Sequence, residues 1–450
     1  MLARLAYHQQ DLLTMLAASL RQLNAAERAQ DPALRAESYA NAATIARVAG
    51  LHRTATRYGT LADRALAEVE HARLEPAGSA GSAESAGSAG TAGSTGSAGS
   101  AGGGAVGGRP VELAVEAANR ARLARGLDQL HAGAFEAARR SFTECRARTL
   151  TPRVAENCTG MLAETALWQG DFTAAAELFA DTAEQAARRV GGDDIGRHWC
   201  LTGQVEAMLR IDGTAPERIR QVLEAARAST ERRRTCEKEL GLRDGPVMRT
   251  IQDMRLLTAT ARLHLRTHRP DDSAFHHGPG DSVLRHGPDD RALTIGVPQP
   301  PDDMATVREV LGLAERLPVG QRGMLECWAG LAELLWALPD PPDRTSARRL
   351  HQHLSRYQAR NPGAAARIGW ARALVLAVAG RNGPAEKAAH RALAAAERLA
   401  TPYDRDRAEE ILLHLSRTTT RRPSGRQPDH GTESGVSPSR ENFSQEFRAR

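Results

Sequence analysis

The sequence predicts an all-α protein, an α-solenoid of stacked helical hairpins, and two observations predict it. One template, Gly-x-aromatic-x-x-Ala-x-x-x-aromatic-x-x-small, begins at Gly133 and again at Gly170. Aromatic residues make up only 4% of the chain and its apolar residues are largely Ala and Leu, a composition that favours close helix packing over strands. A hairpin cannot bury its apolar face alone, so several are expected to pile side by side into one elongated superhelix.

The template describes half of a hairpin. Its glycine ends one helix with a positive φ, its first aromatic residue fills the gap between helices, and its alanine lets the next backbone approach closely. The best copies are Gly133, Phe135, Ala138, Phe142 and Cys145, and Gly170, Phe172, Ala175, Phe179 and Thr182. Weaker copies are Gly50, His52, Ala55 and Ala62, and Gly383, Ala385, Ala388, Ala392 and Ala395.

Residues 1–75 are expected to form two helical hairpins, because apolar residues recur at helical spacing. One face comprises Leu12, Leu13, Leu16, Leu20 and Leu23, and another comprises Ala43, Ile45, Ala46 and Val48. Residues 76–108 are almost entirely Gly, Ser, Ala and Thr, a composition that predicts a disordered, flexible linker.

Residues 109–268 carry the two best copies of the template and are expected to be helical repeats. Thr151 followed by Pro152 is typical of a helix start, and Pro216 with Glu217 indicates another. The next segment, 269–301, is rich in Pro, Gly, His and Asp and is expected to be a flexible loop.

Residues 302–417 resume the helical pattern, and 418–450 are expected to be a disordered tail rich in Ser, Arg, Gly and Pro. Steps of three and four predict one broad buried face in this third helical block. That face comprises Leu325, Trp328, Ala329, Ala332, Leu335 and Trp336.

The charge of the chain favours a solvated, salt-bridged surface over nucleic-acid binding. Its 60 basic residues are interleaved with 54 acidic ones, for a net charge of +6. The basic runs at 232–234 and 421–422 have no aromatic platform beside them. Five cysteines without a Cys-x-x-Cys pair, an N-terminus unlike a signal peptide and no long apolar run predict a cytoplasmic protein that does not enter membranes.

No catalytic residue or cofactor site is expected. The string at 102–107 matches G-x-G-x-x-G, but no strand precedes it, and neither Lys238 nor Lys387 belongs to a phosphate-binding loop. No Gly-x-Ser-x-Gly element is present. The acidic pairs at 302–303 and 409–410 suit helix starts and surfaces.

No metal site is expected either. His198 and Cys200 lie close together, and His276 and His277 follow Asp271 and Asp272, but neither group has the paired spacing of zinc ligands. The segment 150–153, Leu-Thr-Pro-Arg, matches the opening of a response-regulator helix-turn-helix, and a capped helix start explains it more simply.

The repeat copies resemble tetratricopeptide repeats. Stretches at 5–11, 17–21, 166–172, 326–333 and 396–403 also resemble, in order, the C-terminal helical region of multidomain bacterial signalling proteins. Those proteins join a class III nucleotide cyclase domain, a STAND-type ATPase and a tetratricopeptide-like array. The resemblance covers most of residues 1–417 without the cyclase and ATPase portions, so it implies a sensor or regulatory arm.

The sequence therefore predicts a non-catalytic protein whose concave face binds a protein or peptide partner, in bacterial signalling or transcriptional regulation. Trp168, Trp328, Trp336 and Trp370 are candidate anchors only as a group, and none is assigned a binding role. The alternative is a truncated or split component of a nucleotide cyclase or STAND ATPase whose catalytic domains lie on another chain. The partner itself could be an ATPase or cyclase.

Overall fold

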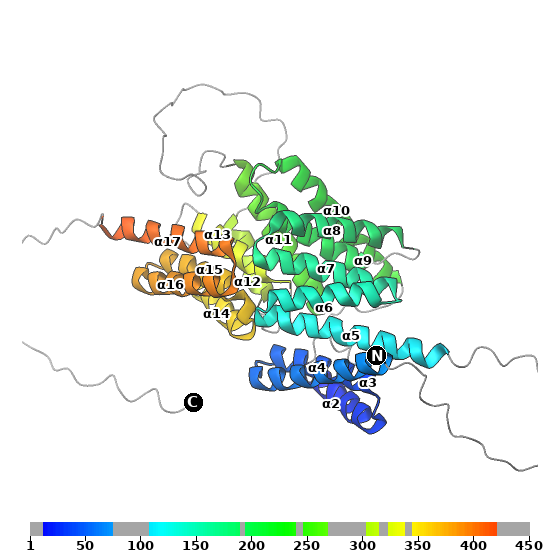
Figure 1. Cartoon of the computed structure of the whole chain (residues 1–450). Helices are drawn as coiled ribbons and strands as arrows, with labels where there is room; N and C mark the ends of the chain where they lie inside the picture. Colours follow the sequence, from blue (N-terminus) through cyan, green and yellow to red (C-terminus); the bar gives the residue numbers. More distant parts are fainter. Residues whose placement is uncertain are drawn as a thin grey trace, which may run out of the picture.

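The computed structural model describes residues 12–74, 108–189, 194–239, 246–268, 303–314, 323–337 and 344–420. Every regular element within these ranges is a helix and none is a strand, so the prediction of an all-α protein is confirmed for them (Figure 1). None of the described helices combines the length and the apolarity needed to cross a bilayer.

The helices fall into three groups along the chain (Figure 1). The first group is α2 (Leu12–Ala29), α3 (Pro32–Val48) and α4 (His52–Leu74). The second is α5 (Gly108–Ala132), α6 (Phe135–Arg148), α7 (Pro152–Gln169), α8 (Phe172–Arg188), α9 (Asp194–Met208), α10 (Pro216–Glu239) and α11 (Pro246–His268). The third is α12 (Asp303–Ala314), α13 (Leu325–Ala337), α14 (Arg344–Arg360), the short 3₁₀ turn η2 (Pro362–Ala364), α15 (Ala365–Val378), α16 (Asn382–Leu399) and α17 (Pro402–Thr420).

Local signals in the sequence set several of these boundaries. Helices α7 and α10 begin at Pro152 and Pro216, as predicted, although the Thr151 side chain makes no capping hydrogen bond. Gly133 and Gly170 have φ values of +84° and +86° in the turns after α5 and α7, the left-handed conformation that the template requires. Helix α17 continues to Thr420, which lies beyond the predicted start of the tail.

The two best template copies pack as expected. In both copies the two aromatic residues, the alanine and the small residue of the template are all buried. The Phe142 ring lies against Gly126 of α5, where an added Cβ atom would lie 2.5 Å from Phe142 Cε1. The Phe179 ring lies against Gly203 of α9, where an added Cβ atom would lie 2.6 Å from Phe179 Cζ. Aromatic rings on α6 and α8 therefore fill space that glycine leaves open on a neighbouring helix, α5 before α6 and α9 after α8.

The weaker copy placed at Gly383 is wrong by one helical turn. Gly380 has the positive φ, +72°, and occupies the turn before α16, whereas Gly383 lies inside the helix. Counted from Gly380, the template positions coincide with the buried Ala385, Ala389 and Ala392. The alanine-rich sequence of α16 offers small residues in several registers, so the pattern alone did not decide between them.

The predicted buried face of α13 is confirmed, since all of its residues are buried except Trp336, which is partly buried. In the first group, Ala43, Ile45 and Ala46 are buried as predicted. Leu20 is 47% exposed, contrary to prediction. Leu23, three residues further along, is buried as predicted, and α2 packs against α3.

The first group packs onto α5, across the segment predicted to be a linker. Helices α3 and α5 lie against each other, and Arg120 of α5 forms a bidentate ion pair with Glu37 of α3 at 2.8 and 2.9 Å. Arg47 pairs with Asp128 where both side chains are buried. The two flanking blocks are therefore stacked.

The third group folds back onto the turns of the second (Figure 1). At Gly133 a Cβ atom would lie 3.1 Å from Gly363 Cα, and at Gly170 it would lie 2.9 Å from Tyr403 Cβ. In an elongated superhelix each repeat contacts only its neighbours. That expectation is wrong for these helices, because the turn after α5 contacts η2 and the turn after α7 contacts the start of α17.

Several predictions fall outside the described residues. These are residues 1–11, where a further helix of the first block was expected, the linker at 76–108 except Gly108, the loop at 269–301 and the tail from 421 onward. The glycine-rich string at 102–107 and the histidine pair at 276–277 lie in these segments as well.

Candidate functional site

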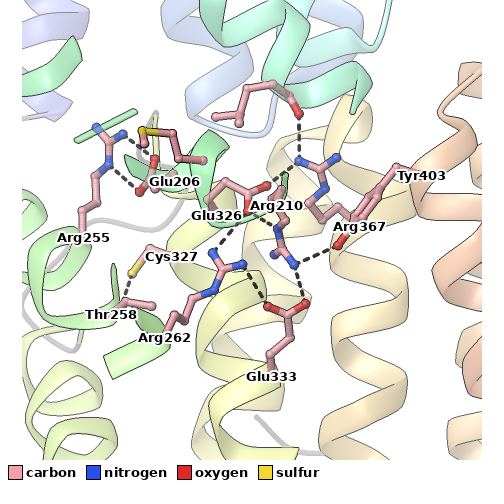
Figure 2. Close-up of polar contacts among 12 residues, drawn as sticks. Glu206, Arg210, Arg255, Thr258, Arg262, Glu326, Cys327, Glu333, Arg367 and Tyr403 are labelled. Carbon is pink, nitrogen blue, oxygen red and sulfur yellow. Dashed lines mark hydrogen bonds and ion pairs between the residues drawn. The ribbon is translucent and has the colours of Figure 1, made fainter. Parts of the chain in front are cut away.

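A set of buried arginine and carboxylate side chains joins the second group of helices to the third, and we call it the charge cluster. Its members come from four helices and from the turn after α9, and Figure 2 shows five of them, Arg210, Arg262, Glu326, Glu333 and Arg367. They are Arg210 after α9, Arg262 of α11, Glu326 and Glu333 of α13, Arg367 of α15, and Asp404 and Arg407 of α17.

Glu326 lies at the centre of the charge cluster. It is the second residue of α13, a helix that is apolar around most of its circumference, and its side chain is fully buried. Arg210 Nε donates to its Oε2 atom at 2.8 Å, Arg262 lies at 3.6 Å, and Arg367 pairs with Oε1. Burial alone would raise the pKa of Glu326, but Arg210, Arg367 and Arg262 together lower it, so the carboxylate is ionised.

Glu333 follows two helical turns later and faces the same way. Arg210 pairs with it, and Arg262 and Arg407 lie 3.3 and 3.5 Å from its oxygens. Burial raises its pKa, but these three guanidinium groups outweigh burial and lower the pKa to about 2. The spacing of Glu326 and Glu333 thus places two ionised carboxylates on one face of α13.

Arg367 connects three helices. Its Nε atom donates to Asp404 at 2.9 Å, its Nη1 atom donates to the Leu167 carbonyl at 2.9 Å, and it pairs with Glu326. That carbonyl lies in the last turn of α7, where carbonyl groups lack partners within the helix and the dipole favours a cation. Trp370 Nε1 also donates to Asp404, at 3.0 Å, and completes the coordination of that carboxylate.

Aromatic rings enclose the arginines. The guanidinium carbons of Arg367 and Arg210 each lie 5.5 Å from the centre of the Tyr403 ring. Arg210 also donates to the Tyr403 hydroxyl at 2.9 Å, and Tyr403 packs edge-on against Phe172 with ring centres 4.8 Å apart. Template residue Phe172 thus packs directly against the charge cluster, with a cation–π contact to Arg367, whose guanidinium carbon lies 5.3 Å from the centre of the Phe172 ring.

A smaller polar group lies beside the charge cluster. Arg255 of α11 forms a bidentate ion pair with Glu206 of α9 at 2.9 and 2.6 Å, both buried (Figure 2). Glu164 of α7 accepts a hydrogen bond from Trp168 at 3.0 Å, and its other oxygen, Oε2, has no hydrogen-bond partner. Burial raises the pKa of Glu164 to about 6, with Arg255 opposing and Glu206 adding to the shift.

The arrangement suits holding helices in register. Within the described residues, each carboxylate of the charge cluster is paired with at least one arginine. Such pairs are costly to break from one side, because the remaining charge stays buried without a partner. The charge cluster therefore fixes how α13, α15 and α17 sit against the ends of α7 and α9.

His198 and Cys200, the described pair considered as metal ligands, do not face each other on α9. His198 is buried and its Nδ1 atom lies 3.1 Å from the Ala226 carbonyl and 2.6 Å from the Thr230 hydroxyl, on neighbouring α10. Cys200, two residues away on the same helix, is a free thiol buried in a hydrophobic core with Leu167 and Phe179. Residues two apart on a helix do not face each other.

The four tryptophans are core residues to different degrees. Trp168 and Trp370 are 2% and 0% exposed, Trp328 is 5% exposed, and Trp336 is partly buried.

In the basic run at 232–234, Arg234 pairs with Asp253 of α11 and lies 3.9 Å from Glu231.

Sequence reasoning missed the charge cluster and a pair of thiols. The Cys145 and Cys158 thiols, buried on α6 and α7, lie within hydrogen-bonding reach, and this contact lowers the pKa of Cys145. For the charge cluster, a usable signal was present: Glu326 and Glu333 repeat at heptad spacing inside an apolar helix. Charged residues on a face otherwise predicted to be buried require partners from other helices.

No protein-family model matches the chain, and a search of the curated proteins finds no relative.

Proposed function

We propose that this chain is a non-catalytic protein that mediates protein–protein interaction through tetratricopeptide-like helical hairpins, with its third group of helices closed back onto the second. In this proposal it acts as a regulatory or sensor arm in bacterial signalling or transcriptional regulation. The observation that carries the proposal is the aromatic-over-glycine packing of Phe142 on Gly126 and Phe179 on Gly203. Repeated hairpins packed in this way give a large preorganised surface, on which a few anchors can supply most of the binding energy.

The charge cluster supports a regulatory role within this proposal. It joins the repeat-bearing helices α7 and α9 to α13, α15 and α17, so both groups move as one unit while the ion pairs hold. Two packed blocks joined by a polar contact form an element with two possible arrangements, and a partner that binds one of them better would shift the balance.

The proposal is tested by affinity capture from native lysate with the tagged full-length chain as bait. We expect a protein that co-purifies, binds the purified chain at a defined stoichiometry in calorimetry, and protects neighbouring helices from hydrogen exchange. Absence of any saturable partner, or turnover of nucleotide by the purified chain alone, would contradict the proposal.

The same capture experiment distinguishes the proposed adaptor from the alternative, a split cyclase or ATPase. A split cyclase or STAND ATPase predicts that the captured fraction carries cyclase or ATPase activity, whereas an independent adaptor predicts a partner without it. Nucleic-acid binding predicts retention on a phosphate matrix with a steep dependence on salt. Elution at low salt is expected instead, because the basic and acidic residues of the surface are interleaved.

A further inference from the structure

A pocket of about 260 Å³ opens between α14, α15 and α16, away from the charge cluster. Its floor is closed by Gly369 of α15, where a Cβ atom would lie 2.8 Å from Ala392 Cβ of α16, so the helices are in close contact there. The polar side chains that line it are His351, Gln358, Arg372, Arg381, Lys387 and Arg391.

The lining of this pocket is cationic and contains no carboxylate. Four of its side chains are arginine or lysine, and the structure gives none of these four an ion pair with a described residue. Elsewhere in the described chain, buried arginines such as Arg255 and Arg367 are paired with carboxylates. Among the described residues, therefore, nothing balances the positive charge of the pocket.

Arg372 is the deepest of these cations and is half-buried. Its Nη1 atom donates to Gln358 Oε1 at 2.7 Å, while its Nε atom is buried without a hydrogen-bond partner. Burial, and then repulsion from Arg391, lower its pKa. Burial also lowers the pKa of His351, and Arg372 and Arg381 lower it further. A bound anion would offset all of these costs.

The start of α16 adds to the positive potential. Its N-cap residue, Arg381, makes no side-chain capping hydrogen bond, and its first turn contains no acidic residue. The first backbone N–H groups of a helix have no partner within it, and its dipole places partial positive charge at this end. Pro384, in this first turn, lines the pocket, so the helix end and the side-chain cations act on the same space.

We propose that this pocket binds a small polyanion bearing phosphate groups, as a site for an effector ligand. Its volume lies below the roughly 300 Å³ lower end of pockets for drug-sized ligands, so it fits a phosphate or pyrophosphate group better than a whole nucleotide. Arginine suits this ligand because its planar guanidinium can donate two hydrogen bonds to phosphate oxygens. The exposed Arg381, Lys387 and Arg391 leave the mouth open for the rest of a larger ligand.

The test is calorimetric titration of the full-length chain with inorganic pyrophosphate at low ionic strength, with phosphate, sulfate and chloride for comparison. We expect pyrophosphate to bind at one site, and to bind there more tightly than chloride. Lys387→Gln and Arg391→Gln are each expected to weaken binding by about tenfold, because each removes a charge at the mouth of the pocket. The matched control is Arg398→Gln, an exposed arginine on α16 that does not line the pocket, with an expected change below twofold.

Equal weakening by Arg398→Gln, or no weakening by either pocket variant, would overturn the proposal. The pKa of His351 provides a second measurement, because a bound anion raises it. The variant His351→Gln lacks the imidazole and so identifies its NMR signal. In the unaltered chain, saturating pyrophosphate is expected to shift the NMR titration of His351 to higher pH, and an unchanged titration contradicts binding in this pocket. A parallel titration with a nucleoside triphosphate shows whether the phosphate groups come free or as part of a nucleotide. The proposal does not depend on the partner-binding function.

Discussion

Replacing Glu164 with glutamine tests whether burial raises the pKa of its carboxyl group in the folded protein. Glu164 is buried on α7, accepts a hydrogen bond from Trp168 Nε1 at 3.0 Å and leaves Oε2 without a partner. The amide oxygen of glutamine can accept the same hydrogen bond and has nearly the same shape. The substitution therefore removes the ionisation and little else.

The magnitude follows from the pKa values of the two states. Burial raises the pKa of Glu164 from 4.5 to about 6 in the folded chain. Between these values the folded state holds more protons than the unfolded state, so stability falls as the pH rises and the loss is complete above the folded pKa. A difference of roughly 1.5 pKa units corresponds to about 2 kcal/mol.

The assay is equilibrium urea unfolding of both proteins at several pH values from 4 to 8, followed by tryptophan fluorescence and circular dichroism. The free energy of unfolding of Glu164→Gln is expected to gain about 2 kcal/mol relative to the unaltered chain as the pH rises across this range. Other groups titrate equally in both proteins, so the difference between them isolates Glu164.

A difference that stays constant with pH would refute the reasoning, because it would mean that Glu164 ionises equally easily in both states. The control is Glu177→Gln on α8, whose carboxyl group is exposed to solvent. Its free energy of unfolding is expected to run parallel to that of the unaltered chain at every pH.

Three further changes test the packing. Arg367→Met leaves Asp404 without its bidentate partner and is expected to cost about 3–5 kcal/mol in unfolding free energy, with faster hydrogen exchange in α15 and α17. Gly170→Ala adds a Cβ atom 2.9 Å from Tyr403 at φ +86°, and thermal unfolding should show a greater loss than for Gly380→Ala, which has a positive φ but open space. Phe179→Ala empties a fully buried site and is expected to cost about 3–5 kcal/mol in chemical denaturation.

Each of these three predictions has an outcome that would contradict it. Unaltered hydrogen exchange in α15 and α17 after Arg367→Met would show that the charge cluster does not hold the third group of helices. Equal losses at Gly170 and Gly380 would show that the turn after α7 does not contact α17. For Phe179, the comparison is Leu413→Ala at a position that is 49% exposed, and a similar cost at both sites would contradict tight packing against Gly203.

Local sequence patterns predicted the helices well because the relevant interactions are local. Pro152 and Pro216 mark helix starts through backbone geometry alone, and the glycines at 133 and 170 mark turns because they accept a positive φ. The register of the copy near Gly380 was misjudged because alanines fill α16 in every register, and the pattern there has no aromatic residue to fix it.

The charge cluster could not be assembled from the sequence, although its glutamates were visible inside an apolar helix. Arg210, Arg367 and Asp404 belong to three other parts of the chain, and each of these looks like an ordinary surface charge on its own. Only the fold brings them within hydrogen-bonding distance. The same holds for the cationic pocket, whose lining comes from α14, α15 and α16.

By itself, the sequence determined that the described chain is helical, where several of its helices begin and which aromatic residues pack into the hairpins. Those properties depend on backbone preferences and on contacts between residues close in the chain. The tertiary structure alone decided that the third group of helices closes back onto the turns of the second, and which charges are buried there. Whether an arginine lowers or raises the stability of the fold depends on how deeply it is buried and on a partner from elsewhere in the chain. A linear sequence pattern specifies neither.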